Sequence, residues 1–357
     1  MLDLGTDTVL VTGATGWLGQ GFLNALSNGL PDCKRLSQPQ PALTIRALVL
    51  PGQEGTVTAV CPQAEVVTGD LTNLQDCRRF CAHAQQSVLF HLAGVIHPRR
   101  TREFYAVNVG GTRNLLAAAQ EAGVRRAVVM SSNSTIGCNP HPDHRFDEAS
   151  PYHPYMGYGR SKVLMEQHVK AVQAAGQIAT VIIRAPWFYG PFQPLRQTLF
   201  FHIIRQGTVP IVGGGENRRS MAYLDNLSQG MLLAALTPAA NGQIYWIADA
   251  RPYTMNEIVT TIERLLETEF GQVCKHTRLH LPGMVSKIAW LCDWSIQSLG
   301  FYQQKIHVLS EMNKTIACSI EKARQELGYA PTVALEEGMR RSLRWLMATS
   351  PSVLNGK

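Results

Sequence analysis

The sequence predicts a doubly wound α/β fold, in which helices cover both faces of a parallel sheet and a smaller C-terminal part forms a lid. Strand-like apolar runs alternate with helical patterns through the first half of the 357 residues. This alternation is typical of parallel sheets. After Pro186 the chain changes to aromatic and Pro/Gly-rich loops that are followed by further helices.

The expected strands lie near residues 8–12, 43–50, 64–68, 87–92, 125–132 and 178–185. The expected later helices lie near 194–206, 225–236, 254–268 and 283–298. We expect one domain over residues 1–188, to which a segment at about 220–248 returns. Residues 189–219 and 249–350 are expected to form the second, smaller domain.

Composition agrees with an ordinary globular α/β protein, since 45% of the residues are hydrophobic and 17% are charged. The net charge is +7, but the basic residues are scattered, so we expect no nucleic-acid partner and prefer an anionic small molecule. Of the eight cysteines only Cys77 and Cys81 lie close together, with no second pair to complete a zinc site. We therefore expect reduced thiols and no metal.

The expected location is cytoplasmic, because the first strand starts within ten residues of Met1 and leaves no room for a signal peptide. The apolar stretch from Ile288 to Phe301 is too short to span a bilayer and is interrupted by Asp293 and Gln297. Peripheral contact of this stretch with a membrane surface stays open.

A glycine-rich turn joins the first strand to the first helix, in the segment Thr12-Gly13-Ala14-Thr15-Gly16-Trp17-Leu18-Gly19. Gly13 suits a tight turn, Gly16 lets backbone N–H groups approach a pyrophosphate, and Gly19 lets the helix pack closely on the strand. The positive end of the helix then faces the phosphates. This order predicts a dinucleotide-binding Rossmann domain, although the spacing is Gly-x-x-Gly-x-x-Gly.

Tyr158 and Lys162 stand four residues apart and therefore share one helix face. The ammonium, together with an oxidised nicotinamide, is expected to lower the pKa of the phenol, so that Tyr158 works as a general base. Ser131 and Ser132 end the strand that precedes them, where polar groups reach the ligand crevice of a parallel sheet. Ser132 is our candidate for holding the reacting substrate oxygen.

These motifs occur in one order over residues 8 to about 347, and the chain resembles the extended short-chain dehydrogenase/reductase family, the NAD-dependent epimerase/dehydratase group. The resemblance implies that Ser132, Tyr158 and Lys162 form the catalytic triad. It implies cofactor contacts from the glycine turn (Gly13, Thr15, Gly16, Trp17, Leu18, Gly19) and from Asp70, Leu71, Leu92, Ala93, Gly94, Asn108, Ser131, Tyr158, Lys162, Ala185 and Pro186. Asp70 and Leu71 would flank the adenine, and Asn108 would support the active-site helix.

The sequence favours NAD(H) over NADP(H) as the cofactor. An acid that would hold the ribose is missing after the second strand, where Leu50 stands. No Arg or Lys occurs from Ala47 to Asp76 either, so a buried 2′-phosphate would lack a cation there.

The first substrate class is a nucleotide sugar, because Arg219 lies six residues before Asp225, as does the diphosphate-binding arginine of nucleotide-sugar members. Asn133 and Ser134 stand where sugar 4,6-dehydratases carry Asp-Glu, which disfavours dehydration. Epimerisation and simple redox of an alcohol or ketone both stay open. The candidate substrate contacts are Ser132, Asn133, His97, Phe188 and Arg219.

A second substrate class, apolar alcohols and ketones, is about equally well supported, since the chain also resembles 3β-hydroxysteroid dehydrogenase relatives. The segment from Leu281 to Phe301, with Trp290 and Trp294, would then wall an apolar pocket or rest on a membrane. A non-catalytic cofactor-sensing module is the third alternative, but such relatives usually lose the tyrosine or the lysine. We therefore expect an enzyme with a small-molecule substrate, assembled as a homodimer.

Overall fold

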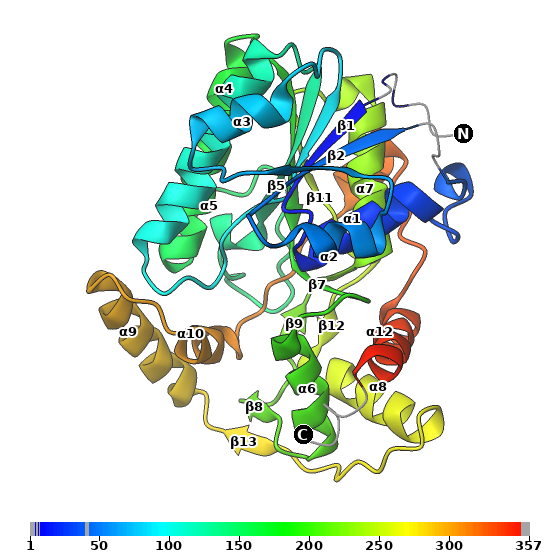
Figure 1. Ribbon diagram of the computed structural model, residues 1–357. Coiled ribbons are helices and arrows are strands. Elements are labelled where there is room, and N and C mark those ends of the chain that lie inside the picture. The colour runs from blue at the N-terminus through cyan, green and yellow to red at the C-terminus, as the bar shows by residue number, and fades with distance from the viewer. Residues whose placement is uncertain (1–3, 5, 7, 40–42, 351–357) are drawn as a thin grey trace.

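A seven-stranded parallel sheet forms the centre of the computed structural model, which describes residues 4, 6, 8–39 and 43–350 (Figure 1). The strand order is β3-β2-β1-β4-β5-β6-β11, and every pairing is parallel. The strands are β1 (Thr8–Thr12), β2 (Thr44–Val49), β3 (Glu65–Thr68), β4 (Val88–His91), β5 (Arg126–Ser132), β6 (Ala179–Ala185) and β11 (Ile244–Trp246). The six predicted strands and the doubly wound parallel fold are confirmed. The seventh strand, β11, lies in the segment that was expected to return to the sheet.

Three helices cover each face of the sheet (Figure 1). One face carries α1 (Trp17–Asn28), α2 (Glu54–Val60) and α7 (Leu224–Leu236), and the other carries α3 (Leu74–Cys81), α4 (Thr112–Glu121) and α5 (Met156–Ala174). Successive side chains of a strand point to opposite faces. In β1, Val9 and Val11 therefore join the core under α1 with Phe22, whereas Leu10 joins the core under α3 with Phe80.

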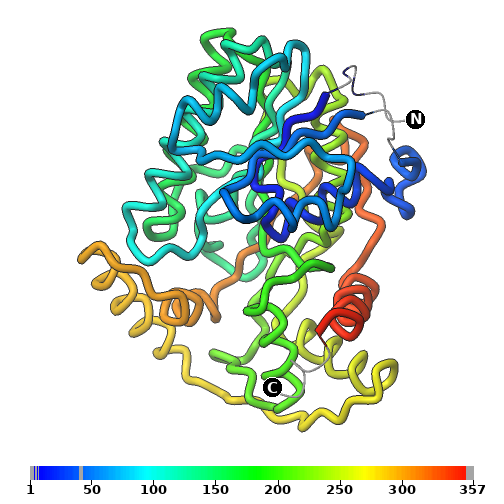
Figure 2. Tube along the Cα trace, in the orientation of Figure 1, coloured from blue at the N-terminus to red at the C-terminus, as the bar shows by residue number. Residues whose placement is uncertain are grey.

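The C-terminal part lies beyond one end of the sheet (Figure 2). Its helices are α6 (Leu195–Arg205), α8 (Met255–Thr268), α9 (Met284–Ser298), α10 (Gln304–Glu311) and α12 (Leu335–Thr349), whereas α11 (Glu321–Leu327) packs beside α7 and β11 of the sheet domain. Short strands connect them: β7 (Trp187–Tyr189), β8 (Pro210–Val212), β9 (Arg218–Arg219), β10 (Met221–Tyr223), β12 (Tyr253–Thr254) and β13 (Leu279–Leu281). The remaining turns are η1 (Lys34–Leu36), the π-helical η2 (Phe104–Gly111), η3 (Asn133–Thr135) and η4 (Pro238–Ala240). The predicted later helices are confirmed, and the domain limits stay a prediction.

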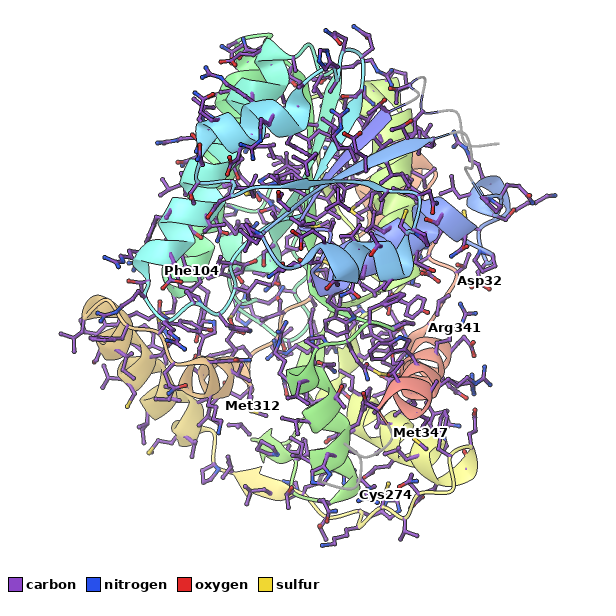
Figure 3. All side chains as sticks on the ribbon, in the orientation of Figure 1. Asp32, Phe104, Cys274, Met312, Arg341 and Met347 are labelled. Carbon is purple, nitrogen blue, oxygen red and sulfur yellow. The ribbon has the colours of Figure 1, made fainter. Side chains whose placement is uncertain are left out.

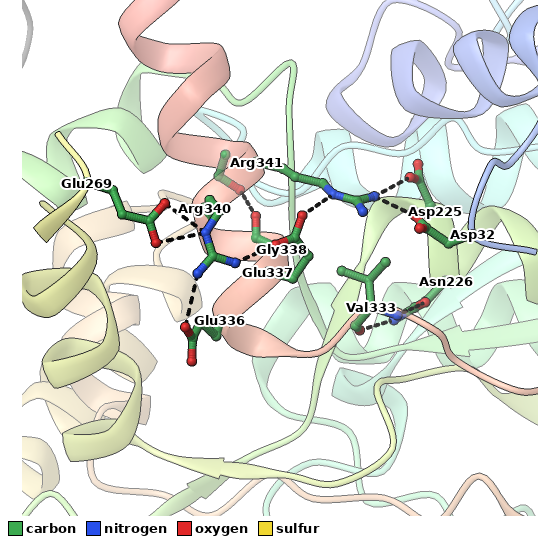
Figure 4. A network of polar contacts seen from close by, with 11 residues as sticks. Asp32, Asp225, Asn226, Glu269, Val333, Glu336, Glu337, Gly338, Arg340 and Arg341 are labelled. Carbon is green, nitrogen blue, oxygen red and sulfur yellow. Dashed lines mark hydrogen bonds and ion pairs between the residues drawn. The ribbon is translucent and has the colours of Figure 1, made fainter.

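Ion pairs fasten α12 to its neighbours (Figure 4). The guanidinium of Arg341 lies 2.6 Å from the carboxylate of Asp32 and 3.8 Å from that of Asp225. The adjacent Arg340 pairs with Glu269, which follows α8. Side chains of α12 thus connect the C-terminal part both to the loop after α1 and to the start of α7.

Within the described residues, no helix is long and apolar enough to cross a membrane. The same residues hold no group of three or more His, Cys, Asp or Glu side chains placed to bind a metal ion. All eight cysteines are free thiols, and Cys292 on α9 is the one that is exposed.

The close contact of α1 with β1 predicts a stability difference between two Gly→Ala variants. Gly19→Ala is expected to lower the free energy of unfolding by about 1–3 kcal/mol, the usual cost of overpacking. The reason is that a Cβ at this position would lie 2.0 Å from the carbonyl oxygen of Gly13. Gly55→Ala in α2 is the control, because no atom lies within 4 Å of its Cβ position. Urea unfolding of both variants measures the difference; equal values would contradict the packing described here.

Candidate active site

The three glycines of the first turn have different surroundings. Gly13 has φ 72°, and a Cβ on it would lie 2.5 Å from the backbone nitrogen of Ala93. Gly19 is equally restricted by the oxygen of Gly13. At Gly16 the nearest atom to an added Cβ is that same oxygen, at 3.2 Å. The fold itself therefore needs Gly13 and Gly19, whereas Gly16 is exposed and a Cβ there would be close to the Gly13 oxygen alone.

The N-terminus of α1 is suited to bind an anion. Its N-cap, Gly16, has no side chain to cap the helix, and the first turn contains no acid. The first N–H groups of a helix have no intrahelical partner and attract phosphate. Trp17 anchors this end by donating from Nε1 to the carbonyl oxygen of Pro191 at 2.7 Å, and Leu18 is buried. Thr15 donates from its hydroxyl to the side-chain oxygen of Gln53 at 2.8 Å. These features fit a dinucleotide pyrophosphate.

The end of β4 is fixed by His91, which lies between two threonine hydroxyls. Its ring nitrogens are 2.7 Å from Thr12 Oγ1 and 2.8 Å from Thr112 Oγ1. Burial is the main cause that lowers the pKa of His91, to about 3. The ring is therefore neutral, and it holds the end of β4 from which Leu92 and Ala93 continue beside the glycine turn.

Asp70 and Leu71 follow β3 and turn the chain toward α3. The carboxylate of Asp70 accepts from the backbone N–H of Thr72 at 2.8 Å. The backbone N–H of Asp70 donates to the carboxylate of Asp76 at 2.8 Å. Leu71 is buried, with its Cβ 3.0 Å from where a Cβ on Gly111 would stand. The backbone of this pair is thus held firmly at the edge where the other strand ends lie.

Asn108, in the π-helical η2, connects the loop after β4 to α5. Its side-chain oxygen accepts from the N–H of Val95 at 2.8 Å, and its amide donates to Val95 O at 3.1 Å and to Ser161 Oγ at 3.0 Å. Gly94 lies beside this contact, since a Cβ on it would be 3.3 Å from Lys162 Nζ. The structure therefore brings Gly94, Asn108 and Lys162 together, and their roles as cofactor contacts stay a prediction.

Ser132 and Tyr158 are hydrogen-bonded where β5 ends and α5 begins, and Lys162 lies one helical turn after Tyr158 on α5. The half-buried Tyr158 is hydrogen-bonded to Ser132, which lowers its pKa, but burial has the larger effect and raises that pKa to about 12. Lys162 is buried and donates from Nζ to the carbonyl oxygen of Met130 at 3.0 Å. Burial lowers the pKa of Lys162 to about 8. In this structure, then, the expected lowering of the Tyr158 pKa is outweighed by burial.

Ser131 points into the protein rather than beside Ser132. Its hydroxyl donates to Glu166 Oε1 at 2.5 Å, and Glu166 also pairs with Arg184 at 2.8 Å and accepts from Tyr152 OH at 2.7 Å. Glu166 belongs to α5 and Arg184 to β6, so this buried network holds the helix on the strand ends. Ala185 and Pro186 follow Arg184 directly, at the same edge of the sheet.

An aromatic wall extends from Tyr158 toward α10. The ring centroid of Phe104 is 5.8 Å from that of Tyr158 and 5.5 Å from that of Tyr302. Tyr302 in turn stacks on His97, whose Nδ1 is 2.8 Å from the tyrosine hydroxyl, and burial is the largest cause that lowers the pKa of His97, to about 4. Figure 3 places Phe104 where the sheet domain meets the α9–α10 hairpin.

The other candidate substrate residues have different neighbours. Arg219 donates from Nη2 to the backbone oxygen of Glu311 at 2.6 Å, whereas the nearest cation to Asp225 is Arg341 (Figure 4). Phe188 packs against Trp17, with ring centroids 5.2 Å apart. Asn133 follows Ser132, and its side-chain oxygen accepts a long hydrogen bond, 3.5 Å, from the hydroxyl of Ser132.

Sequence reasoning missed the contact between α9 and the start of α5. The side-chain oxygen of Gln297 accepts from the N–H of Gly157, the residue before Tyr158, at 3.0 Å. The available signal was the pair Asp293 and Gln297, four residues apart in an otherwise apolar stretch. Four-residue spacing puts them on one helix face, and that face is the one turned toward the protein.

Residues 9–248 match the NAD dependent epimerase/dehydratase family. The chain belongs to this family. It is an enzyme of the extended short-chain dehydrogenase/reductase type, and the seven-stranded Rossmann sheet described above is the fold of its structural neighbours.

Three similar proteins align with nearly the whole length of this family member. The uncharacterized protein y4nL of Sinorhizobium fredii is 53% identical over 98% of each chain. A 3 beta-hydroxysteroid dehydrogenase/Delta 5-->4-isomerase of Mycobacterium tuberculosis is 31% identical over 97% of this chain and 92% of that one. The crystal structure of a UDP-glucuronic acid 4-epimerase from Bacillus cereus in complex with NAD aligns with a TM-score of 0.71 and 20% identity, covering 96% of this chain and 99% of that one.

The exposed position of Gly16 at the start of α1 predicts a variant that folds but does not bind the cofactor. Gly16→Val keeps an ordinary backbone conformation at the N-cap, where φ is −74°, but its side chain would occupy the room that a pyrophosphate needs. NADH fluorescence titration should show no binding. Gly214→Val is the control, because nothing lies within 4 Å of its Cβ position. Unchanged binding by a folded Gly16→Val protein would place the cofactor elsewhere.

Proposed function

We propose that this protein is an NAD(H)-dependent oxidoreductase that interconverts a secondary alcohol and a ketone on an apolar substrate. The observation that carries the proposal is the hydrogen bond between Ser132 and Tyr158 beside the aromatic wall that begins at Phe104, with Lys162 one helical turn further along α5. Polar side chains next to aromatic rings suit a substrate with one reacting oxygen on an apolar frame.

The roles of the triad follow from its chemistry. The nicotinamide, when bound, carries the hydride. Tyr158 gives a proton to the ketone oxygen, or takes it from the alcohol, and Ser132 donates a hydrogen bond to that oxygen. With a pKa of about 8, Lys162 is largely an ammonium below that pH and holds the ribose hydroxyls. Its positive charge near Tyr158 favours the phenolate form.

The preference for NAD(H) rests on the region after β2. The strand ends at Val49, and Leu50 is 46% exposed where an acid or a cation would select the ribose. With no Arg or Lys from Ala47 to Asp76, a 2′-phosphate would find no cation in this segment. The homodimer and the cytoplasmic location stay predictions.

The substrate class changes from the first choice made on sequence. Arg219, the residue that favoured a nucleotide sugar, already uses one nitrogen on the backbone of Glu311. A relative that is similar over nearly its whole length is named a 3 beta-hydroxysteroid dehydrogenase, which supports an apolar alcohol. A nucleotide-sugar epimerase is the second candidate, because the Nε of Arg219 is buried without a partner in the described structure and can take an anionic ligand if the side chain turns.

Tyr158→Phe tests the proposed reaction. The variant is expected to bind NADH nearly as well as the wild type, while turnover falls by about a hundredfold or more, the usual loss of a general acid or base. Tyr105→Phe is the control, since this half-buried tyrosine lies one residue beyond Phe104 and outside the triad. Steady-state oxidation of a cyclic secondary alcohol measures both. A Tyr158→Phe enzyme with wild-type turnover would remove Tyr158 from the mechanism.

Calorimetry with UDP and with a sterol alcohol separates the two substrate classes. We expect the wild type to bind the sterol alcohol and to show no heat with UDP. If UDP binds instead, and Arg219→Ala weakens it by about 1.5–3 kcal/mol, the range for a hydrogen bond to a charged group, the nucleotide-sugar candidate is the correct one. Arg218→Ala controls for the loss of a neighbouring charge.

A further inference from the structure

The polarity of α9 is inverted. Its buried residues are Ser286, Ala289 and Asp293, so the face turned toward the protein is largely polar. Most of its large apolar side chains are exposed. A surface helix of a water-soluble protein normally has the opposite arrangement, with apolar residues inward. A second surface is therefore needed to account for the outward apolar side chains.

The inner face is fully engaged, which fixes the rotation of the helix. Asp293 accepts from Gln297 at 2.9 Å and lies 2.8 Å from His307 Nδ1 on α10. Ser286 donates to the backbone oxygen of Ser310 at 2.7 Å. Turning the apolar face inward would break these bonds and leave the buried His307 without its carboxylate partner, which is costly. The outward apolar face is thus a stable feature of the fold.

The outer face of α9 is a continuous stripe. Met284, Ile288, Leu291 and Trp294 lie three or four residues apart, and 68%, 57%, 56% and 47% of their respective surfaces are exposed. Leu299, exposed to 75%, continues the apolar surface beyond the end of the helix. We call these five residues the outer face.

A basic strip, Arg99, Arg100 and Arg102, borders the outer face. It is joined to the segment after α9, because Thr101 N donates to Gly300 O at 3.1 Å and Tyr302 N donates to Arg99 O at 3.3 Å. The guanidinium of Arg100 lies 4.3 Å from the ring centroid of Phe301. All three arginines are exposed.

The α9–α10 hairpin adds little negative charge to balance this strip. Lys287 and Lys305 are exposed, whereas the acids between residues 284 and 311 are the buried Asp293 and the half-buried Glu311. The outer face and its border therefore combine exposed apolar side chains with net positive charge.

We propose that the outer face of α9 docks on a lipid bilayer that contains anionic headgroups. Apolar side chains of an interfacial helix enter the boundary between headgroups and acyl chains, while flanking Lys and Arg pair with lipid phosphates. A second copy of the chain fits less well, since a two-fold contact would bring together two strips of net positive charge, each with three exposed arginines and one half-buried acid, Glu103. Figures 1 and 2 show the hairpin at one flank of the molecule, where α9 faces outward.

The docking surface lies one helix away from the candidate active site. Gln297 on the inner face contacts Gly157, and Tyr158 follows it in α5. Lipid binding does not depend on the substrate class or on catalysis, so it can be measured with the full chain alone.

Vesicle sedimentation tests the proposal. The full-length protein is expected to sediment with vesicles of phosphatidylcholine and phosphatidylglycerol (3:1), and to stay in solution with pure phosphatidylcholine at the same lipid concentration. Leu291→Ser/Trp294→Ser should weaken binding at least tenfold, and Arg99→Gln/Arg102→Gln about tenfold, because each removes one part of the surface. Leu164→Ser on α5 and Arg113→Gln on α4 are the matched exposed controls, expected to bind as the wild type does.

A second measurement avoids destabilising substitutions. Brominated lipid in anionic vesicles should quench the wild-type tryptophan fluorescence, and Trp294→Phe should lose part of that quenching. The proposal fails if the wild type does not bind anionic vesicles, or if the Leu291→Ser/Trp294→Ser variant binds them as well as the wild type does. It also fails if sedimentation velocity shows a wild-type dimer that this double variant turns into a monomer, since the outer face would then be an interface between copies.

Discussion

One buried carboxylate, that of Glu166, holds together the elements that carry the candidate site. It receives hydrogen bonds from Ser131 at the end of β5 and from Tyr152, and it pairs with Arg184 at the end of β6. Removing one partner of such a buried pair costs about 3–5 kcal/mol, because the other charge stays buried and unpaired. The carboxylate also opposes the effect of burial on the pKa of Lys162, which lies one helical turn before it. The start of α5 is thereby fixed against the strand ends.

Two further side chains clamp the same helix from outside the sheet. The amide of Asn108 donates to Ser161, and the side-chain oxygen of Gln297 accepts from Gly157. These contacts flank Tyr158 on both sides along α5. In the proposed reaction the phenol must lie within hydrogen-bond reach of a substrate oxygen, and two contacts that fix its position protect the rate, because a small misplacement slows the reaction. The burial that raises the pKa of Tyr158 comes with this enclosure.

The parts that the sequence predicted correctly are those with local causes. Strand and helix periodicity located the sheet, and the glycine spacing located a turn that the structure shows to be restricted at Gly13 and Gly19. Contacts over long sequence separation were not predictable. His97 meets Tyr302 only after the chain has folded, and Arg219 meets Glu311. The partner of Arg219 could not be read from its spacing to another residue.

The effect of burial on the pKa of Tyr158 was not predictable for a related reason. Its neighbour Lys162 is visible in the sequence, but desolvation depends on what the tertiary structure packs around the phenol. The very short strands of the C-terminal part were not predicted either, since two or three residues are too few to show an alternating pattern.

The uncapped start of α1, where we propose that the pyrophosphate binds, links folding to the cofactor. With no side chain on Gly16 and no acid in the first turn, the first N–H groups have no partner from the helix or its cap. A dinucleotide that binds the folded chain but not the unfolded chain raises the free energy of unfolding by mass action. The increase is about 2.7 kcal/mol when the free concentration of the dinucleotide is a hundred times its Kd. The resistance of this protein to heat and to proteolysis will therefore follow the cellular concentration of its cofactor.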